Sequence, residues 1–174
     1  STLGHIAILN NWCCPKIDNS KDFIIKDGRH SVVEKMMLKK SLNTFVPNDC
    51  SLGADEHIWL ITGPNMAGKS TFLRQNAHII ILAQIGSYVP AKEAKIGVVN
   101  KLFSRIGASD NISMGQSTFM VEMLETSNII KNADGNSFAI LDEIGRGTAT
   151  FDGLAIAWAI IEKILRHNKS RTLF

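Results

Sequence analysis

The sequence predicts an α/β domain built around a largely parallel sheet. Two continuous apolar runs, residues 58–62 and 137–141, have the composition of strands that are buried on both faces. A segment with helical apolar spacing follows each run, over 70–85 and 154–167. Strands that alternate with helices along a chain form parallel sheets through right-handed crossovers. We therefore expect these strands to share a sheet that is flanked by helices.

The elements before the first apolar run carry weaker signals. Residues 22–27 contain a short apolar run that leads into a turn signal at Gly28, which predicts a strand. Residues 43–53 are polar and contain Pro47, so we expect a loop there.

The rest of the chain continues the alternation of strand and helix. The helix predicted over 70–85 ends before Gly86, a common helix stop, and 101–106 has the apolar content of a strand. The next predicted helix covers 117–131. Its apolar side chains are expected on or near one face: Met120, Met123, Leu124 and Ile130. A final strand is expected at 171–174.

Composition and charge indicate an ordinary globular protein. The chain has 174 residues, of which 45% are hydrophobic and 20% charged, and this excludes a disordered, collagen-like or coiled-coil chain. A chain of this length can form one domain that buries a core without covalent cross-links. The net charge of +3 argues neither for nor against a nucleic-acid partner.

Cysteine usage favours an intracellular protein, whether in a bacterial cytoplasm, a nucleus or a mitochondrion. Cys13, Cys14 and Cys50 form no C-x-x-C pair, so we expect reduced structural thiols and no disulfide scaffold. They share no ligand spacing with the histidines, which argues against a zinc site. The longest aliphatic run, 79–83, is far shorter than the ~20 residues that a membrane span needs.

The most informative motif directly follows the first apolar run. It fits the pattern G-x-x-x-x-G-K-[ST] and reads Gly63-Pro64-Asn65-Met66-Ala67-Gly68-Lys69-Ser70, with Thr71 next. The backbone N–H groups of such a loop and the N-terminus of the following helix can bind phosphates. Lys69 would place a charge at the β- and γ-phosphates, and the Ser70 hydroxyl would bind Mg²⁺. A plain glycine-rich turn is the alternative, but the strand before and the helix after favour the phosphate loop.

A pair of carboxylates, Asp142 and Glu143, follows the later apolar run. Alone, the pair could be a solvated strand end. In a parallel sheet, however, it would lie at the same edge as the phosphate loop. We therefore assign Asp142 to Mg²⁺ and Glu143 to the general base that activates water. Together the motifs predict a Mg²⁺-dependent nucleotide triphosphatase. A kinase would share the loop, but the arginines are scattered and form no lid cluster.

Several further segments are more distinctive than the phosphate loop alone. They are 62–66, 86–90, 114–123 and 142–153, and the segments 28–34 and 45–48 accompany them. Together they closely resemble the ATPase domain of the MutS family of DNA mismatch-repair proteins. The resemblance covers 28–174 and leaves 1–27 as a lead-in from the preceding region. It stops before that family's switch histidine and dimerising helix-turn-helix, so we expect a truncated domain.

The resemblance implies an ABC-type P-loop ATPase that works as a dimer with composite sites. Phe45 matches the family's aromatic residue that stacks on adenine, and Asn65 matches a residue near the γ-phosphate that helps to position water. Ser117 lies in a segment that resembles the signature reaching the partner's bound nucleotide. Residues 148–152 resemble the loop that crosses the dimer interface. Ala67 stands where the family commonly has glycine, which costs some backbone freedom.

The function that the resemblance implies is Mg²⁺-dependent ATP binding and hydrolysis that switches a mismatch-recognition dimer on DNA. The implied partners are a second MutS-family subunit, a MutL-type protein, and mismatched double-stranded DNA bound through domains absent from this chain. Two alternatives stay open: a MutS relative that acts as a recombination clamp, and a module that binds nucleotide without hydrolysing it. An ABC transporter subunit is a weaker alternative, because 114–117 lacks the usual transporter signature.

Overall fold

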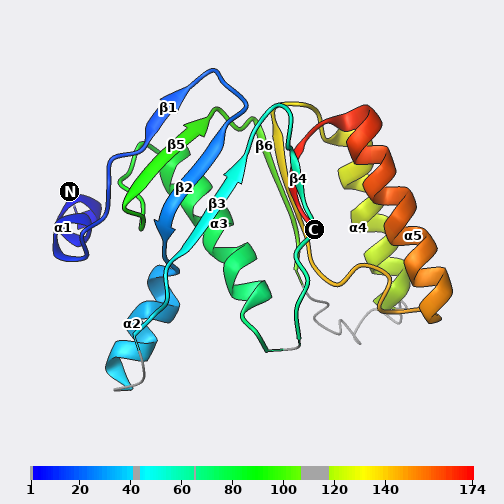
Figure 1. The fold of residues 1–174 in the computed structure, drawn as a ribbon, viewed down its shortest axis with the longest axis horizontal. Coiled ribbons are helices and arrows are strands. Elements are labelled where there is room, and N and C mark those ends of the chain that lie inside the picture. Colours follow the sequence, from blue (N-terminus) through cyan, green and yellow to red (C-terminus); the bar gives the residue numbers. More distant parts are fainter. Residues whose placement is uncertain (1, 41–43, 65, 107–117) are drawn as a thin grey trace. The chain divides into compact units, whose positions relative to one another are not determined.

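The computed structural model describes residues 2–40, 44–64, 66–106 and 118–174. The chain divides into two compact units (Figure 1). Unit 1 contains Ser1–Glu56 and Thr62–Val99, and unit 2 contains His57–Ile61 and Asn100–Phe174.

Unit 1 contains a mixed four-stranded sheet with the strand order β1-β5-β2-β3 (Figure 1). Its strands are β1 (Lys16–Asp18), β2 (Phe23–Gly28), β3 (Asn48–Leu52) and β5 (Glu93–Gly97). β1 runs parallel to β5, whereas β2 is antiparallel to both β3 and β5. Phe23 lies opposite both Leu52 and Ile96, and all three side chains are buried. Alternate side chains of these strands therefore form the core face of the sheet.

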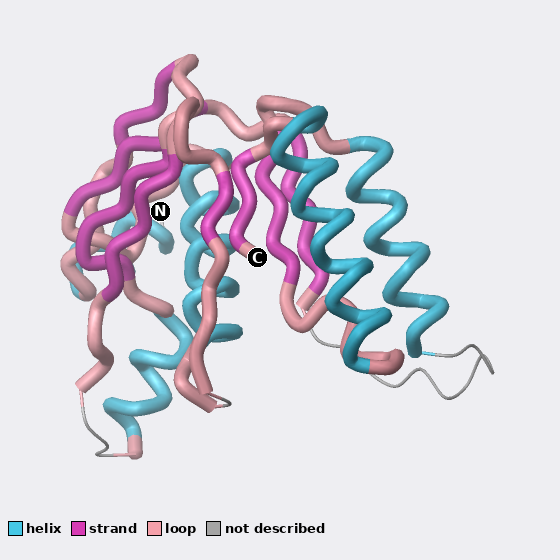
Figure 2. The backbone as a smooth tube through the Cα atoms, turned by 45° about the vertical axis from the view of Figure 1, so that its right-hand side comes forward, coloured by secondary structure: helices cyan, strands magenta, loops and turns pink. Residues whose placement is uncertain are grey.

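In the described part of unit 1, three helices accompany this sheet: α1 (Thr2–Leu9), α2 (Ser31–Lys39) and α3 (Lys69–Gln84). α3 lies against one face of the sheet in Figures 1 and 2, and its buried side chains include Leu73, Ile79 and Ile80. The contact with the sheet is close. A Cβ added to Gly28 of β2 would lie 2.7 Å from Nε2 of Gln75 in α3, so glycine permits this approach.

Unit 2 contains a four-stranded sheet with the order β4-β8-β7-β6, in which every neighbouring pair is parallel (Figure 2). Its strands are β4 (Ile58–Trp59), β6 (Lys101–Arg105), β7 (Ser137–Leu141) and β8 (Arg171–Leu173). All residues of β7 are buried, as is typical of a strand inside a parallel sheet. Because the strands are parallel, their carboxyl ends lie at one edge of the sheet.

In the described part of unit 2, two helices and a short π-helical segment follow the strands: α4 (Thr118–Asn132), α5 (Thr150–Lys163) and Ile164–Asn168. α4 and α5 lie side by side on one face of the sheet in Figures 1 and 2. The core between helices and sheet contains the buried side chains of Ile129, Leu141, Ile160 and Ile164. Full burial of each such side chain contributes about 1.5–3 kcal/mol of stability.

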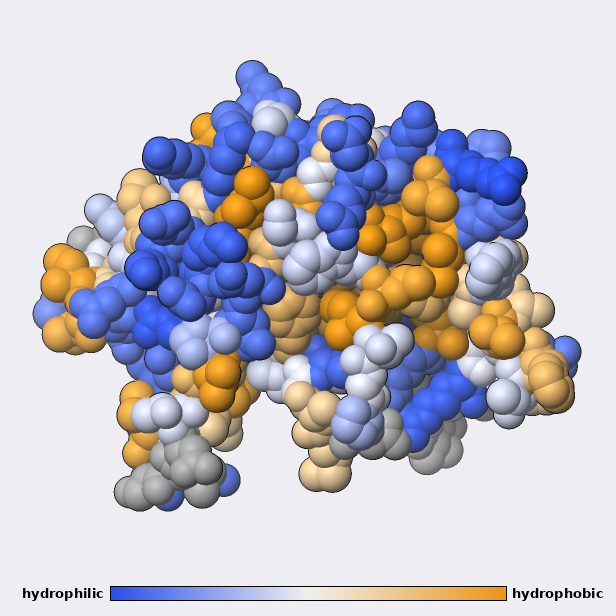
Figure 3. All heavy atoms as spheres, in the orientation of Figure 1, coloured by the Kyte–Doolittle hydropathy of each residue, from blue (hydrophilic) through white to orange (hydrophobic). Residues whose placement is uncertain are grey.

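On the face drawn in Figure 3, hydrophilic residues predominate over the sheet of unit 1, and hydrophobic residues gather over part of unit 2. The sheet of unit 1 carries surface ion pairs, such as Lys26 with Asp49 at 2.9 Å. α5 of unit 2 instead exposes apolar side chains: Phe151 is 85% exposed, Leu154 63% and Trp158 70%. None of the helices in the described ranges is long and apolar enough to cross a membrane.

The predicted largely parallel sheet is confirmed for unit 2 and wrong for unit 1, where β2 runs antiparallel to its neighbours. The predicted loop over 43–53 is also wrong in part, because it contains β3. Pairing with β2 stabilises this strand in spite of its polar composition. Within it, Cys50 and Leu52 are buried, whereas Asp49 and Ser51 are exposed, which is the alternation of a strand with one buried face.

Most of the predicted helices and strands lie within one residue of the observed bounds. The described bounds of α3 and α4 lie within one residue of the predictions, whereas α5 begins at Thr150, four residues before the predicted start. The predicted strand over 58–62 is shortened to β4. The predicted apolar face of α4 is wrong in part: Met120 and Leu124 are exposed, and Glu122 is buried in their place.

Candidate functional site

The phosphate-loop segment, 62–70, leads directly into α3, which begins at Lys69. Met66 has φ +66° and Gly68 has φ +92°, so both adopt the left-handed conformation. A Cβ on Gly68 would meet no atom within 4 Å, and the backbone conformation, not crowding, therefore favours glycine there. The described residues from Thr62 to Gly68 are all exposed, so the loop is open to a ligand.

Lys69 folds back over this loop. Its Nζ donates hydrogen bonds to the carbonyl oxygens of Gly63 and Pro64, the latter at 3.0 Å. The N-terminus of α3 adds the positive end of the helix dipole. Lys69, Ser70 and Thr71 are half-buried at the start of the helix. This arrangement of a cation, a helix N-terminus and hydroxyl groups can bind a polyphosphate.

Three other residues predicted to bind nucleotide are not tested by this geometry. Asn65 and Ser117 lie outside the described residues. Phe45 is half-buried in the coil that leads into β3. Their predicted roles stay predictions.

The acidic pair lies at the carboxyl end of β7. Asp142 is 8% exposed, and its N–H donates a hydrogen bond to the carbonyl oxygen of Arg105, at the end of β6, at 2.8 Å. Glu143 has φ +55°, a left-handed conformation that is uncommon for a residue other than glycine. Its exposed carboxylate is paired with the guanidinium of Arg146. The chain therefore turns sharply at Glu143 and leaves its carboxylate accessible to solvent.

The loop after the acidic pair is in close contact with both helices of unit 2. Oε1 of Glu122, in α4, accepts a hydrogen bond from the N–H of Gly145 at 2.5 Å. A Cβ on Gly145 would lie 2.7 Å from the Cα and carbonyl oxygen of Gly153 in α5. A Cβ on Gly147 would lie 3.0 Å from Cβ of Phe119 in α4. Glycine at these positions therefore allows the loop to lie directly against the helices.

The strand order of unit 2 brings the carboxyl ends of β4 and β7 to one edge of its sheet. β4 and β7 are both parallel to β8, which lies between them. Trp59 of β4 and Ile140 of β7 both pair with Leu173 of β8, so the two residues are at the same level in the sheet. Two strand spacings, about 10 Å, therefore separate the carboxyl end of β4 from that of β7. The phosphate loop follows β4, and Asp142 follows β7. The expectation that these two strands end at the same edge is confirmed.

The sequence pattern did not single out two residues beside the acidic pair, Arg105 and Glu122. Both are buried, with 5% and 4% exposed, and Nη2 of Arg105 lies 3.9 Å from Oε2 of Glu122. A signal was nevertheless present in the sequence. Glu122 is a lone carboxylate within the apolar stretch 119–124, where a charged side chain on the buried face needs a specific partner.

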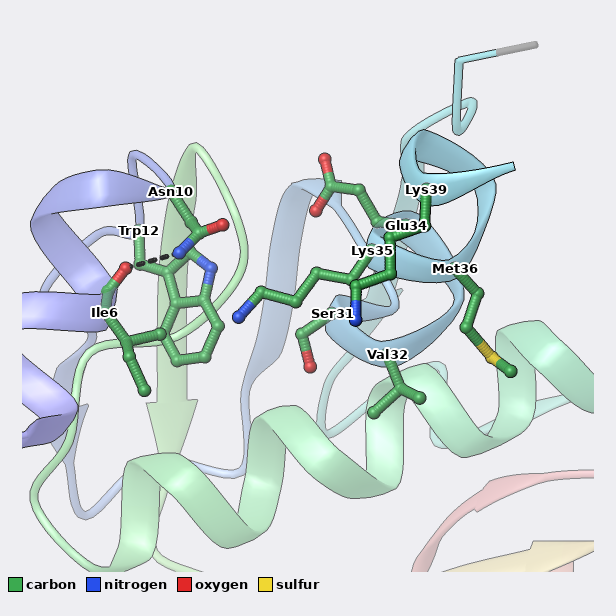
Figure 4. A pocket seen from close by; sticks show the side chains of 9 residues that line it. All are labelled: Ile6, Asn10, Trp12, Ser31, Val32, Glu34, Lys35, Met36 and Lys39. Carbon is green, nitrogen blue, oxygen red and sulfur yellow. Dashed lines mark hydrogen bonds between the residues drawn. The ribbon is translucent and has the colours of Figure 1, made fainter. Parts of the chain in front are cut away.

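A separate cavity of about 390 Å³ lies between α1 and α2 in unit 1 (Figure 4). Apolar side chains of Ile6, Trp12, Val32 and Met36 line it together with polar groups. Figure 4 shows the side chain of Lys35 extending toward the indole of Trp12. Among the residues predicted to bind nucleotide, none of those that the structure describes lines this cavity.

The buried thiol of Cys50 has the character of a structural cysteine. Burial raises its pKa to about 12, so the thiol stays protonated near neutral pH and is a poor nucleophile. Cys13, Cys14 and Cys50 are all free. In the part of the chain that the structure describes, no group of three or more His, Cys, Asp and Glu side chains could hold a metal ion.

Known proteins match this chain over most or all of its length. The family model described as MutS domain V matches residues 59–174. A DNA mismatch repair protein MutS from Ruegeria pomeroyi is 57% identical over 176 residues, which cover 100% of this chain and 20% of that protein. The protein of the same name from Orientia tsutsugamushi is 61% identical over 171 residues, which cover 98% of this chain and 19% of that protein. The chain thus spans about a fifth of the length of these curated relatives.

Proposed function

Because this chain belongs to the MutS family and contains its domain V, we propose that it binds and hydrolyses ATP with Mg²⁺. The observation that carries the proposal is the strand order of unit 2. It places the strand end that leads into the phosphate loop at the same edge as Asp142 and Glu143. Parallel α/β sheets bind their ligands at this edge. An ABC-type P-loop fold is part of the same proposal.

The residues present fit a complex of Mg²⁺ with a nucleotide. The Lys69 ammonium donates to two carbonyl oxygens in the phosphate loop, and phosphate oxygens are stronger acceptors for the same donor. The Ser70 hydroxyl and the Asp142 carboxylate offer the hard oxygen ligands that Mg²⁺ prefers. The bound ion would neutralise charge that develops on the phosphates.

In the proposed reaction, side chains of this chain bind the nucleotide, orient the attacking water and accept its proton. Lys69 and the N–H groups of the phosphate loop hold the phosphates, while the ring of Phe45 stacks on the adenine. Glu143 accepts a proton from the attacking water, which the amide of Asn65 helps to orient. Ser117 acts on the nucleotide bound by a second MutS-family subunit.

For the whole protein, of which this chain spans about a fifth, we extend the proposal to a dimer that ATP switches on mismatched DNA, with a MutL-type protein as a further partner. ATP can drive such a switch only if the two conformations of the dimer bind it with different affinities. A recombination clamp of the same family would share this domain. The two are distinguished by whether the N-terminal part of the protein carries an aromatic wedge for the minor groove.

ATP binding without hydrolysis is the second candidate function. The observation that favours it is the ion pair between Glu143 and Arg146. The guanidinium of Arg146 binds one oxygen of this carboxylate, Oε2, and so competes with the attacking water for the proposed base. A chain in which the pair keeps the water away from Glu143 would bind ATP and leave it intact.

The test measures phosphate release from Mg-ATP over a range of protein concentrations, beside ATP binding on the same sample. In Glu143→Ala we expect ATP binding to persist and phosphate release to fall by about 100-fold or more, the usual contribution of a general base. Glu162→Ala is the matched control, because Glu162 of α5 forms a similar exposed pair with Arg166 of the following π-helical segment. Full turnover in Glu143→Ala would exclude Glu143 as the base.

The concentration dependence separates the two candidate functions. Specific activity that rises with protein concentration would support a composite site, in which Ser117 acts on the nucleotide of a second copy. ATP binding with no phosphate release at any concentration would instead favour the binding module.

A further inference from the structure

Glu122 is a carboxylate on the buried face of α4. It is 4% exposed and shares this face with Thr126 and Ile129, at helical spacing. Burial of a carboxylate is costly unless the group is both paired and hydrogen-bonded. An apolar side chain would fill this position at lower cost, so the partners of Glu122 are the reason to look for a role.

Two buried groups contact the Glu122 carboxylate. The N–H of Gly145 donates to Oε1 at 2.5 Å, and Nη2 of Arg105 lies 3.9 Å from Oε2. Arg105 also has its Nε 2.9 Å from Oε2 of Glu125, one helical turn further along α4. Arg105 thus balances the charge of Glu122, and an ionised acceptor forms a stronger hydrogen bond to an N–H than a neutral one.

This cluster flanks the acidic pair on both sides. Before the pair, the carbonyl oxygen of Arg105 accepts the N–H of Asp142 at 2.8 Å. After the pair, Glu122 accepts the N–H of Gly145. Between these two hydrogen bonds, Glu143 has φ +55°, and such a conformation persists only where the surroundings determine it. The orientation of the Glu143 backbone therefore depends on the buried pair.

We propose that Glu122 is a positioning residue that couples α4 to the loop carrying Glu143, a role that rests on the proposed ATP hydrolysis. When α4 moves, the Glu122 carboxylate moves with it and carries the N–H of Gly145, two residues from the proposed base. The hydrogen bond between Glu122 and Gly145 thus connects α4, which spans Thr118–Asn132, with the loop that carries the proposed base.

The test compares three variants of the full chain. Glu122→Met keeps the volume of the side chain but removes the acceptor, whereas Glu122→Gln keeps a carbonyl oxygen for Gly145 and removes the charge. Glu125→Gln is the matched control, because Glu125 also contacts Arg105 but is exposed, whereas the N–H of Gly145 donates to Glu122.

We expect phosphate release per bound ATP to fall about 100-fold in Glu122→Met, as displacements of about 1 Å at reacting groups produce. Glu122→Gln should recover part of this loss, and Glu125→Gln should stay within about twofold of the parent chain. ATP affinity should stay within about twofold in all three variants, because the phosphate loop is unchanged. Wild-type turnover in Glu122→Met would overturn the proposal.

Amide hydrogen exchange at Gly145 provides a readout that does not depend on activity. In Glu122→Met we expect faster exchange of the Gly145 N–H, with unchanged exchange in β7. Unchanged exchange at Gly145 would overturn the proposal. Faster exchange throughout unit 2 together with lower ATP affinity would also overturn it, because Glu122 would then be a general stability residue. If the parent chain releases no phosphate, the proposed hydrolysis fails, while the exchange at Gly145 still decides whether Glu122 holds the loop.

Discussion

The two loops of the proposed site are held in place in different ways. In the phosphate loop, 62–70, the described residues up to Gly68 are exposed, and Lys69 donates to carbonyl oxygens of the loop itself. The acidic loop, 143–149, is attached to α4 through Glu122 and lies against α5 at Gly153. A loop that must admit a ligand leaves its groups open to that ligand, whereas a loop that must orient a base is held by the surrounding fold.

The largest expected effect comes from Gly145→Ala. The new Cβ would lie 2.7 Å from two backbone atoms of Gly153, at a residue with φ +83°. We expect the free energy of unfolding to fall by about 3 kcal/mol, from strain and overpacking together. Gly68→Ala is the matched control, because Gly68 has φ +92° but its added Cβ would have no atom within 4 Å. It should cost about 1 kcal/mol, from backbone strain alone. Equal losses in chemical denaturation would contradict the difference between the loops.

A smaller effect, on binding and not on stability, is expected from Lys69→Ala. Removal of the ammonium should weaken ATP binding by about 10–100-fold, because a hydrogen bond to a charged group contributes about 1.5–3 kcal/mol. The free energy of unfolding should change by less than about 0.5 kcal/mol, because the carbonyl oxygens of Gly63 and Pro64 are in an exposed loop and can bind water. Titration calorimetry with Lys92→Ala as an exposed control checks this. Undiminished ATP affinity would exclude Lys69 from the site.

The smallest effect is expected from Arg146→Ala. The Arg146 side chain is 73% exposed, and its ion pair with Glu143 lies on the surface of the acidic loop. Surface pairs contribute about 0–1 kcal/mol, so the melting temperature should fall by less than about 4 °C. Thermal unfolding of the variant measures this shift. A much larger decrease in the melting temperature would show that the acidic loop is held by its own charges and not by α4 and α5.

Elements with strong local signals were predicted closely. The continuous apolar run at 137–141 coincides with β7, because a run of this length suits a buried strand whatever its partners are. α3 begins one residue before its predicted start, since Gly68 and Gly86 mark its two ends in the sequence. The phosphate loop and the acidic pair were also predicted from local patterns, and these site assignments stay predictions until the measurements above are made.

Elements that depend on distant partners were missed or misassigned. β3 was predicted as a loop, because its polar residues give a weak strand signal until β2 pairs with it. Glu122 was overlooked on α4, because its hydrogen-bond partner Gly145 lies 23 residues away in the chain. Spacing along one helix shows which side chains share a face, but it does not show which face another element covers.

By itself, the sequence determined the family, the alternation of strands and helices in the second half, and the identity of the proposed phosphate-binding and acidic groups. Only the tertiary structure decided that the sheet of unit 1 is mixed and that Glu122 contacts the loop after Glu143. The physical reason is the range of the interactions. Apolar periodicity and turn residues act between neighbours in the chain, whereas strand pairing and the partners of a buried charge are established only when distant segments meet.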